Sequence, residues 1–461
     1  MRAAPADTAE PAFRPRLARH LGELLRLAWP VMLSRAGILL MAFCDIAMLG
    51  RYAPGAVGVA NLGLAVFIPV MVTTIGLCTG VVAVVSRHHG AGEWAECGRA
   101  WRRAIVWGTT LSLGAMWLVW QTEVVLVLFG QEADMAARGT AVAHALAPGL
   151  LAQVLFAISA FYLESTGRPY VALLVMVMAN PVNFGLNALL IYGMAWFPPL
   201  GAVGAALAST AARIAAAAAM IAFILRQPGA RKAGVRGPWE TFWGPGGWRA
   251  GWMMRRLGLS AGLGNACETF GFAAMTLFAG QISTLALDAY SISHNLVSTL
   301  FMVGLGLAIA TGVRVGTEMG RGRASEAAFA GWTGLAAALG IMSALGLGVF
   351  LLREPLTVVY TDDPAIAARA AALFAVAALV FVPDTAQVVM GQAVRSLGDA
   401  WVAIAIYAGC FVALLIPLGW AMVNVWGWDE RGLVCAIILA CILATVLLAA
   451  RFRILTRRQA A

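Results

Sequence analysis

The chain has 461 residues, of which 61% are apolar and only 12% carry a charge, and its mean hydropathy is +0.83. A soluble globular domain has about half apolar and a quarter charged residues, so this composition excludes one and indicates an integral membrane protein. The net charge of +10 is typical of membrane topology and contact with anionic headgroups, not of nucleic-acid binding, because the arginines gather at the ends of apolar segments.

Residues 1–23 precede the first apolar segment and contain several prolines and arginines. They lack the apolar core and the small-residue cleavage site of a signal peptide. We therefore predict a cytoplasmic N-terminal tail, with the first apolar segment itself directing the chain to the membrane.

Twelve apolar segments follow, and each reaches the roughly 20 residues that a helix needs to cross a bilayer core. They are predicted to be helices, because an unclosed strand cannot satisfy its backbone in lipid. Six lie in an N-terminal lobe, residues 24–225, and six in a C-terminal lobe, residues 257–455. The segments lie at about residues 24–50, 56–84, 104–130, 140–164, 170–192, 202–225, 257–280, 287–315, 327–353, 365–393, 400–425 and 432–454.

Residues 226–256 join the lobes in a basic linker whose prolines and glycines interrupt any helix. Arginines also end the last span and enter the tail at residues 456–461, whereas the loops on the other side balance a few arginines with acids. Because positive charge stays inside, the linker and both termini are predicted to be cytoplasmic.

The two lobes are predicted to be internal repeats. Shifting the sequence by about 230 residues places Arg26 on Arg256 and Gly90 on Gly320. Since each lobe has an even number of spans, the repeats run parallel, around an axis along the membrane normal. The predicted fold is an all-α membrane protein with twelve transmembrane helices in two pseudo-symmetric six-helix bundles.

The first lobe carries polar side chains at one depth. Asp45 lies in the first span, where an ionised carboxylate must be protonated, hydrated or paired. Asn180, Asn183 and Asn187 share one face of the fifth span, and Asn187 lies as far from the outer end as Asp45. We predict an Asp/Asn cluster here. The alternatives are an acid exposed to the headgroups and amides that only join helices.

The second lobe carries Glu268 in the seventh span and Asp384 in the tenth, at similar depths. Asn265 precedes Glu268 by three residues and Gln387 follows Asp384 by three, so each acid shares a helix face with an amide. We predict that these acids, with Asp45, couple transport to protons or cations, and that the amides support them. Their repeat partners are not acids, so this chemistry is asymmetric.

Other charged residues inside the predicted spans suggest weaker hypotheses. Arg35 and Arg213 could each pair with an acid or reach an interface. Glu164 and Arg395 occupy equivalent repeat positions at inner helix ends and are a candidate gate pair closing the cytoplasmic side. The seven cysteines have no CxxC spacing, so neither a disulfide framework nor a zinc site is predicted.

With these features placed, the sequence resembles the multidrug and toxic compound extrusion (MATE) family, in its NorM-like branch. The resemblance covers essentially the whole chain after residue 24. Its most specific segments are FCDIAMLG at 43–50, VVSRHHGAG at 84–92, ETF at 268–270, VRVG at 313–316 and DTAQVV at 384–389.

The resemblance implies that Asp45 with Asn183 and Asn187 forms a proton-linked cluster, and that Glu268 and Asp384 bind the coupling cation, Na⁺ being a candidate there. It implies a secondary active multidrug efflux antiporter that exports organic cations or amphipathic drugs in exchange for H⁺ or Na⁺. Such a protein alternates between outward-open and inward-open V shapes.

The chain departs from the family pattern at three positions. Val380 stands where a tyrosine is expected one turn before the tenth-span acid, and Tyr290 where a histidine is expected in the eighth span. Loss of the tyrosine oxygen weakens the expectation that this site is selective for Na⁺. Arg35 stands where a glutamine is often found, which makes it a candidate modulator of substrate charge.

No ATP-binding GxxxxGK[ST] loop and no convergent His/Asp or Ser/His set is visible in the sequence. We therefore expect no enzyme activity and no cofactor, the coupling ion being H⁺ or Na⁺. The expected partners are drug substrates and the lipid bilayer, not nucleic acid, for a monomer in a bacterial inner membrane. A lipid-linked precursor flippase of the same superfamily stays open as the alternative, while a passive channel is disfavoured because the acids form no repeated ring.

Overall fold

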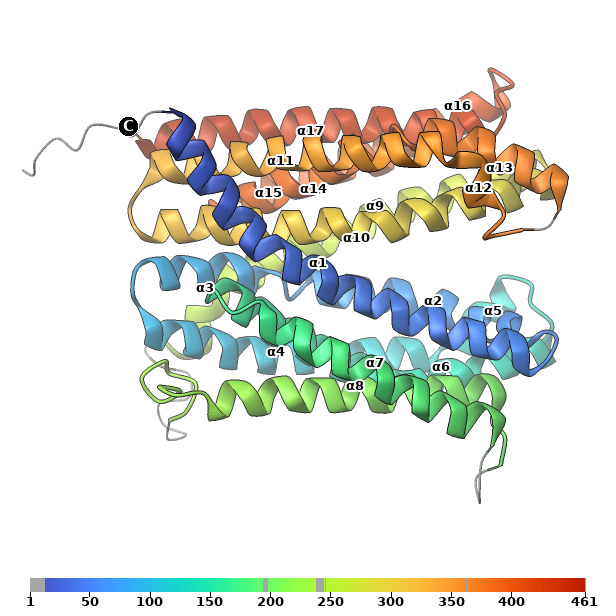
Figure 1. Ribbon diagram of the computed structural model, residues 1–461, viewed down its shortest axis with the longest axis horizontal. Helices are drawn as coiled ribbons and strands as arrows, with labels where there is room; N and C mark the ends of the chain where they lie inside the picture. Colours follow the sequence, from blue (N-terminus) through green and yellow to red (C-terminus); the bar gives the residue numbers. More distant parts are fainter. Residues whose placement is uncertain (1–12, 194–197, 238–243, 245, 362, 461) are drawn as a thin grey trace, which may run out of the picture.

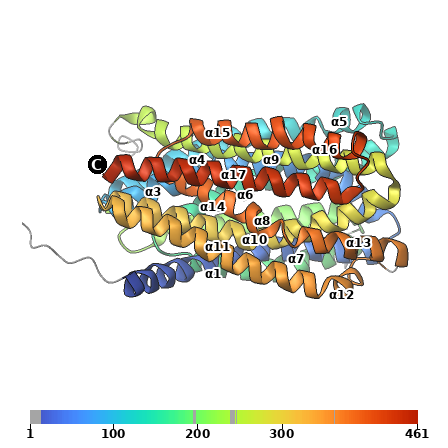
Figure 2. The same ribbon diagram turned by 90° about the horizontal axis from the view of Figure 1, so that it is seen from above.

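The computed structural model describes residues 13–193, 198–237, 244, 246–361 and 363–460, and these residues form helices, turns and loops without a strand. Figure 1 shows two bundles, one above the other, with the chain passing from the lower to the upper bundle. Seen at 90° in Figure 2, the helices run side by side along the long axis of the molecule. This arrangement confirms the predicted all-α class.

The first bundle is built from the N-terminal part of the chain. Its helices are α1 (Phe13–Tyr52), α2 (Ala56–Gly76), α3 (Gly80–Gly90), α4 (Trp94–Trp120), α5 (Thr122–Leu128), α6 (Ala133–Ser165), α7 (Tyr170–Tyr192) and α8 (Gly201–Arg226).

The second bundle follows the linker, which contains the short 3₁₀ helix η2. Its elements are η2 (Gly247–Gly251), α9 (Trp252–Ile282), α10 (Thr284–Gly320), α11 (Ala324–Leu351), α12 (Arg353–Thr357), α13 (Pro364–Ala377), α14 (Phe381–Ser396), α15 (Trp401–Tyr407), the π-helix η3 (Ala408–Leu414), α16 (Leu415–Asn424) and α17 (Glu430–Ala460).

Each of the twelve predicted spans contains a helix or a broken helix. By length and apolar composition, nine described helices can cross a membrane, and two bent pairs, α4 with α5 and α13 with α14, raise this number to 11. Over its most apolar stretch, helix α9 is less apolar than these helices because it carries Glu268 and other polar residues, yet its 31 residues are long enough to span.

Local sequence explains where several helices begin. The Ser283 side chain accepts a hydrogen bond from the Ala286 amide and caps α10. The Asp363 carboxylate accepts from the Ala365 amide, with Pro364 at the first helical position of α13. The chain bends by 47° between α13 and α14, where residues 378–380 form turns.

Helix α1 begins at Phe13, before the predicted start of the first span at residue 24, so part of the predicted tail is helical. These early turns lie on the second bundle. Arg19 Nη2 and His20 Nε2 each lie 2.6 Å from Glu326 Oε2 of α11, and Glu23 forms an ion pair with Arg314 of α10. The rest of α1 packs on α7 and α8, so this helix connects both bundles.

The two bundles meet through α3 and α10 with no room for side chains at the contact. A Cβ atom on Gly90 would lie 2.0 Å from the Thr317 carbonyl oxygen. One on Gly320 would lie 2.0 Å from the Arg87 carbonyl oxygen. The same repeat that matches Gly90 to Gly320 also matches Arg87 to Thr317, so the crossing is pseudo-symmetric.

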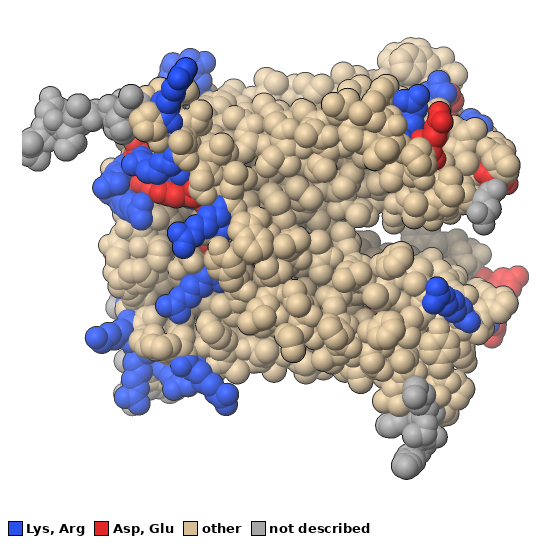
Figure 3. Space-filling view, viewed as in Figure 1, with Lys and Arg blue, Asp and Glu red and all other residues tan. Residues whose placement is uncertain are grey.

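Charge and shape distinguish the two ends of the molecule. Figure 3 shows lysines and arginines gathered at the left-hand end and a hollow between the bundles at the right-hand end. The α3–α10 contact lies toward the basic end, where both helices reach their last residues. The molecule is therefore closed at its arginine-rich end and open at the other.

Candidate functional site

Hydrogen bonds reach both carboxylate oxygens of Asp45 in the first bundle. Asn187 Nδ2 donates to Asp45 Oδ1 at 2.6 Å and Asn183 Nδ2 donates to the same oxygen at 3.2 Å. Ser209 Oγ of α8 donates to Oδ2 at 2.5 Å. The structure thus brings together three residues that the sequence singled out and adds Ser209, whose only signal was a hydroxyl in an alanine-rich helix.

Asn180 shares a helix face with the other two asparagines but does not reach the carboxylate. Its Nδ2 donates to the Gly37 carbonyl at 3.1 Å and to the Met176 carbonyl at 2.9 Å. It lies nearly two turns from Asn187 and joins α7 to α1. For this one asparagine, the helix-joining alternative describes the observed contact.

Arg213 lies one turn along α8 from Ser209. Its guanidinium lies over the Phe67 ring, 5.4 Å from the centroid. Arg213 and Asp45 interact electrostatically without a hydrogen bond or an ion pair between them in the described residues.

Arg35 forms an ion pair with Glu164 of α6 at 3.4 Å, and both side chains are buried. The predicted gate between Glu164 and Arg395 is therefore wrong for this conformation. Arg395 Nε instead donates to Gln392 Oε1 at 3.3 Å, and its guanidinium lies over the Tyr407 ring. These three charged residues therefore contact residues of their own bundle and not of the opposite one.

The acids of the second bundle share one amide. Gln387 Nε2 donates to Glu268 Oε1 at 3.0 Å and lies 3.4 Å from Asp384 Oδ1. Cys441 Sγ of α17 donates to the same Asp384 oxygen at 3.8 Å. Gln387 Oε1 is buried without a hydrogen-bond partner. Two carboxylates and a free amide oxygen are donors of the kind that hard cations take.

The surroundings of these acids depend on irregular backbone. The π-helix η3 begins directly after Tyr407, whose hydroxyl donates to the Gln387 carbonyl at 3.4 Å. Thr445 Oγ1 donates to the Pro383 carbonyl at 3.1 Å. π-Helical turns often lie at functional sites, and the sequence carried no signal for this one.

Asn265 lies toward the contact between the bundles. Its Nδ2 lies against Gly76 of α2, where a Cβ atom would come within 2.8 Å. This amide therefore lines the contact between the bundles, and no hydrogen bond between Asn265 and Glu268 is found in the described residues, so its role beside the acid stays a prediction. In the part of the chain that the structure describes, no group of three His, Cys, Asp or Glu residues is placed to hold a metal ion.

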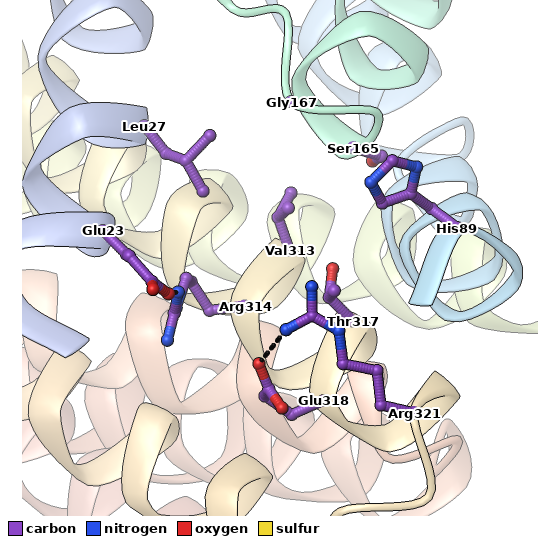
Figure 4. Close-up of a pocket in the computed structure, with 10 residues that line it drawn as sticks. All are labelled: Glu23, Leu27, His89, Ser165, Gly167, Val313, Arg314, Thr317, Glu318 and Arg321. Atoms are coloured by element: carbon purple, nitrogen blue, oxygen red, sulfur yellow. Dashed lines mark hydrogen bonds and ion pairs between the residues drawn. The ribbon is translucent and has the colours of Figure 1, made fainter. Parts of the chain in front are cut away.

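A separate pocket of about 190 Å³ lies between the bundles at the arginine-rich end. Figure 4 shows Glu318 of α10 facing Arg321, the residue that follows this helix, with Glu23 of α1 beside Arg314. The Arg321–Glu318 distance is 2.7 Å. Acids and arginines are matched in this pocket, and Asp45, Glu268 and Asp384 do not line it.

The MatE family model matches residues 30–189 and 261–421, once in each bundle. The chain belongs to the MATE family. A probable multidrug resistance protein NorM of Caulobacter vibrioides is 35% identical, over 99% of this chain and 97% of that protein. Multidrug resistance protein PmpM of Pseudomonas aeruginosa is 28% identical, over 88% of this chain and 85% of that protein. The relatives named NorM confirm the predicted NorM-like branch for this chain.

Solved MATE structures share the fold. The eukaryotic MATE transporter AtDTX14 superposes with a TM-score of 0.87 at 16% identity, covering 96% of this chain and 100% of that one. An outward-facing conformation of a multidrug resistance MATE family transporter gives 0.86 at 16% identity, covering 99% and 100%. The predicted twelve-helix MATE fold is therefore confirmed.

Proposed function

We propose that this MATE protein is a secondary active antiporter that exports organic cations or amphipathic drugs in exchange for H⁺ or Na⁺. The observation that carries this proposal is the second-bundle pair, Glu268 and Asp384, sharing the single amide of Gln387. Two carboxylates with so few donors inside a membrane need a cation or a proton. Relatives named as multidrug resistance proteins support the class of cargo.

Proton or Na⁺ binding supplies the coupling. When the acids are ionised, they attract a positively charged substrate into the cleft. When H⁺ or Na⁺ neutralises them, this attraction is lost and the substrate leaves. The acids cannot bind the coupling ion and the cationic cargo tightly at the same time, so the two are exchanged.

The direction of transport follows from charge. The arginine-rich end is cytoplasmic by the positive-inside rule, so both termini are cytoplasmic and the hollow opens outward. In this conformation the coupling ion enters from outside, and release of the α3–α10 contact then opens the cytoplasmic side for loading. We place the protein in a bacterial inner membrane as a monomer, with no enzymatic activity and no cofactor.

The flippase alternative has less support. A flippase for an anionic lipid-linked precursor needs basic cavity residues, and Arg35 is already paired with Glu164. Of the two arginines that the sequence places well inside spans, that leaves Arg213, whose Nη1 is buried without a hydrogen-bond partner.

The test is accumulation of tetraphenylphosphonium in inverted vesicles under separate pH and Na⁺ gradients. We expect wild type to accumulate the cation with an acidic or a Na⁺-loaded lumen, and Asp45→Asn, Glu268→Gln and Asp384→Asn each to lose at least about tenfold in rate, about 1.4 kcal/mol. Asp429→Asn, at an exposed loop acid, is the matched control and should retain transport. Full gradient-driven transport by all three variants would reject the site.

A further inference from the structure

Arg213 faces the interior of the first bundle. It lies one turn from Ser209, on the same side of α8 as the buried Met220, and the Arg213 residue as a whole is half-buried. Ser209 donates to Asp45, so the backbone of Arg213 lies about one turn, or about 5–6 Å along the helix axis, from the residue that contacts the acid. The ring of the fully buried Phe67 lies beneath it.

The guanidinium is not saturated by partners. Arg213 Nη1 is shut off from solvent and has no hydrogen-bond partner. The buried arginines Arg35 and Arg395 differ, because Arg35 pairs with Glu164 and Arg395 donates to Gln392. A buried guanidinium without a close counter-ion is costly, and a cation–π contact offsets only part of that cost.

The acid opposite it is held by neutral groups. Asn183 and Asn187 of α7 and Ser209 of α8 supply the hydrogen bonds to Asp45, and Arg213 is the charged side chain that acts on it electrostatically. From α2, the packed side chain is the uncharged Phe67. The net charge of this site is therefore set by one carboxyl group and one guanidinium.

We propose that Arg213 is the internal cation that expels a cationic substrate from the first bundle when Asp45 takes up a proton. With Asp45 ionised, the site is neutral overall and its carboxylate faces the cargo. With Asp45 protonated, the site carries the unopposed charge of Arg213 and repels a cation. This inference rests on the proposed antiport function and assigns the substrate-release step to a residue outside the coupling acids.

Coulomb's law gives the size of the effect. Two unit charges about 6 Å apart at an effective dielectric constant of about 20 change an affinity by roughly a hundredfold, and hydration reduces this to tenfold or somewhat more. A release step of this size does not require the substrate to compete with a second ion for the same oxygen atoms.

The test is binding of tetraphenylphosphonium, a cation that does not titrate, to purified full-length protein in lipid nanodiscs. Asp45→Asn fixes the neutral form of the acid and should bind the cation at least about tenfold more weakly than wild type. Asp45→Asn with Arg213→Gln should recover most of that loss. Asp45→Asn with Arg213→Lys keeps the charge and should remain weak.

Two results would overturn the inference. In the first, the Arg213→Gln double variant binds tetraphenylphosphonium as weakly as Asp45→Asn alone. In the second, the double variant changes the binding of a neutral triphenyl compound of similar size as much as that of the cation, which would reveal repacking instead of charge. If wild type neither binds nor transports tetraphenylphosphonium, the antiport proposal is rejected as well. If wild type shows gradient-driven transport but the Arg213 substitutions leave cation binding unaltered, this inference alone is rejected.

Discussion

At the residue scale, the carboxylates of the two bundles differ in the number of hydrogen bonds that they accept. Asp45 receives three hydrogen bonds from neutral side chains, while Glu268 and Asp384 share one amide and Asp384 receives one long contact from the Cys441 thiol. A carboxylate can accept about four hydrogen bonds, so the second-bundle acids have unused acceptor capacity. From this difference we infer that an incoming cation would bind in the second bundle, which stays a prediction.

His20 and Glu326 form a pH-sensitive contact outside the membrane-spanning segments. Burial lowers the pKa of His20, against the opposing effect of the hydrogen bond that His20 Nε2 donates to Glu326. Burial alone would raise the pKa of Glu326, but His20, Arg16 and Arg19 hold it below its ordinary value. His20 Nδ1 also accepts a 2.8 Å hydrogen bond from Arg314. Protonation of His20 would therefore place a second positive charge against that arginine.

We predict that acidification loosens the start of α1 from α11. A lowered histidine pKa means that His20 binds a proton more readily once the start of α1 has left α11. The contribution of His20 to this contact is therefore complete above about pH 6.5 and is lost as the pH falls. The depressed pKa of Glu326 adds a loss of the same sign below about pH 4. Spin-label distances between the starts of α1 and α11 should lengthen on acidification, and His20→Gln should remove the change at mildly acidic pH. A wild-type distance that stays constant would contradict the prediction.

At the element scale, breaks in the helices determine the direction in which the polar side chains of the second bundle point. The turn before α14 and the π-helix η3 both lie beside the second-bundle acids. Asp384 thereby falls in the first turn of a helix, and Tyr407 reaches the backbone of Gln387. A continuous α-helix at either position would turn these side chains away from each other.

The pair of Arg369 and Glu430 holds α13 against α17. Arg369 Nε lies 2.5 Å from Glu430 Oε1 and Arg369 Nη2 lies 2.8 Å from Oε2. This two-point contact has a buried carboxylate and a guanidinium that is about a third exposed.

We predict that Glu430→Gln lowers the free energy of unfolding by about 1–3 kcal/mol, because one strong bidentate contact is lost and solvent screening limits its strength. Thermal unfolding of the purified protein measures the change. Arg431→Gln, on the exposed and longer 3.8 Å contact to Asp429, is the matched control and should stay within about 0.5 kcal/mol. Equal effects of the two substitutions would show that the contact does not hold α13.

At the scale of the whole molecule, closure of the basic end depends on backbone contact between the bundles. Gly90 and Gly320 leave no space for a Cβ atom against the opposite helix. Ion pairs of α1 with α10 and α11 cross the same end. Rocking of the bundles must therefore break a close-packed contact and a charged one together.

We predict that Gly90→Ala shifts the protein toward the conformation open at the basic end. The added methyl would lie 2.0 Å from the Thr317 carbonyl oxygen, a separation that the closed contact cannot accept. Labelling of a cysteine introduced at Ser86, which is buried at this contact, should become faster. Gly114→Ala is the matched control, because nothing lies within 4 Å of its Cβ position. Equal labelling rates in the two variants would show that closure tolerates the methyl.

The sequence by itself determined the membrane class, the all-helical fold with twelve spans and the duplication, while the common depth of the acids stays a prediction. These properties are local, since hydropathy, helical spacing and charge asymmetry act over one or two turns. Asp45 with Asn183 and Asn187 was within reach of such reasoning, because a shared helix face and a shared depth leave few other partners.

The tertiary structure alone decided which groups pair. Glu164 contacts Arg35 and not Arg395, Asn265 lies against Gly76, and a hydroxyl from α8 completes the Asp45 cluster. Partner choice depends on which helices become neighbours and how each is rotated about its axis. That is settled by packing between segments far apart in the chain, and a one-dimensional pattern does not contain it.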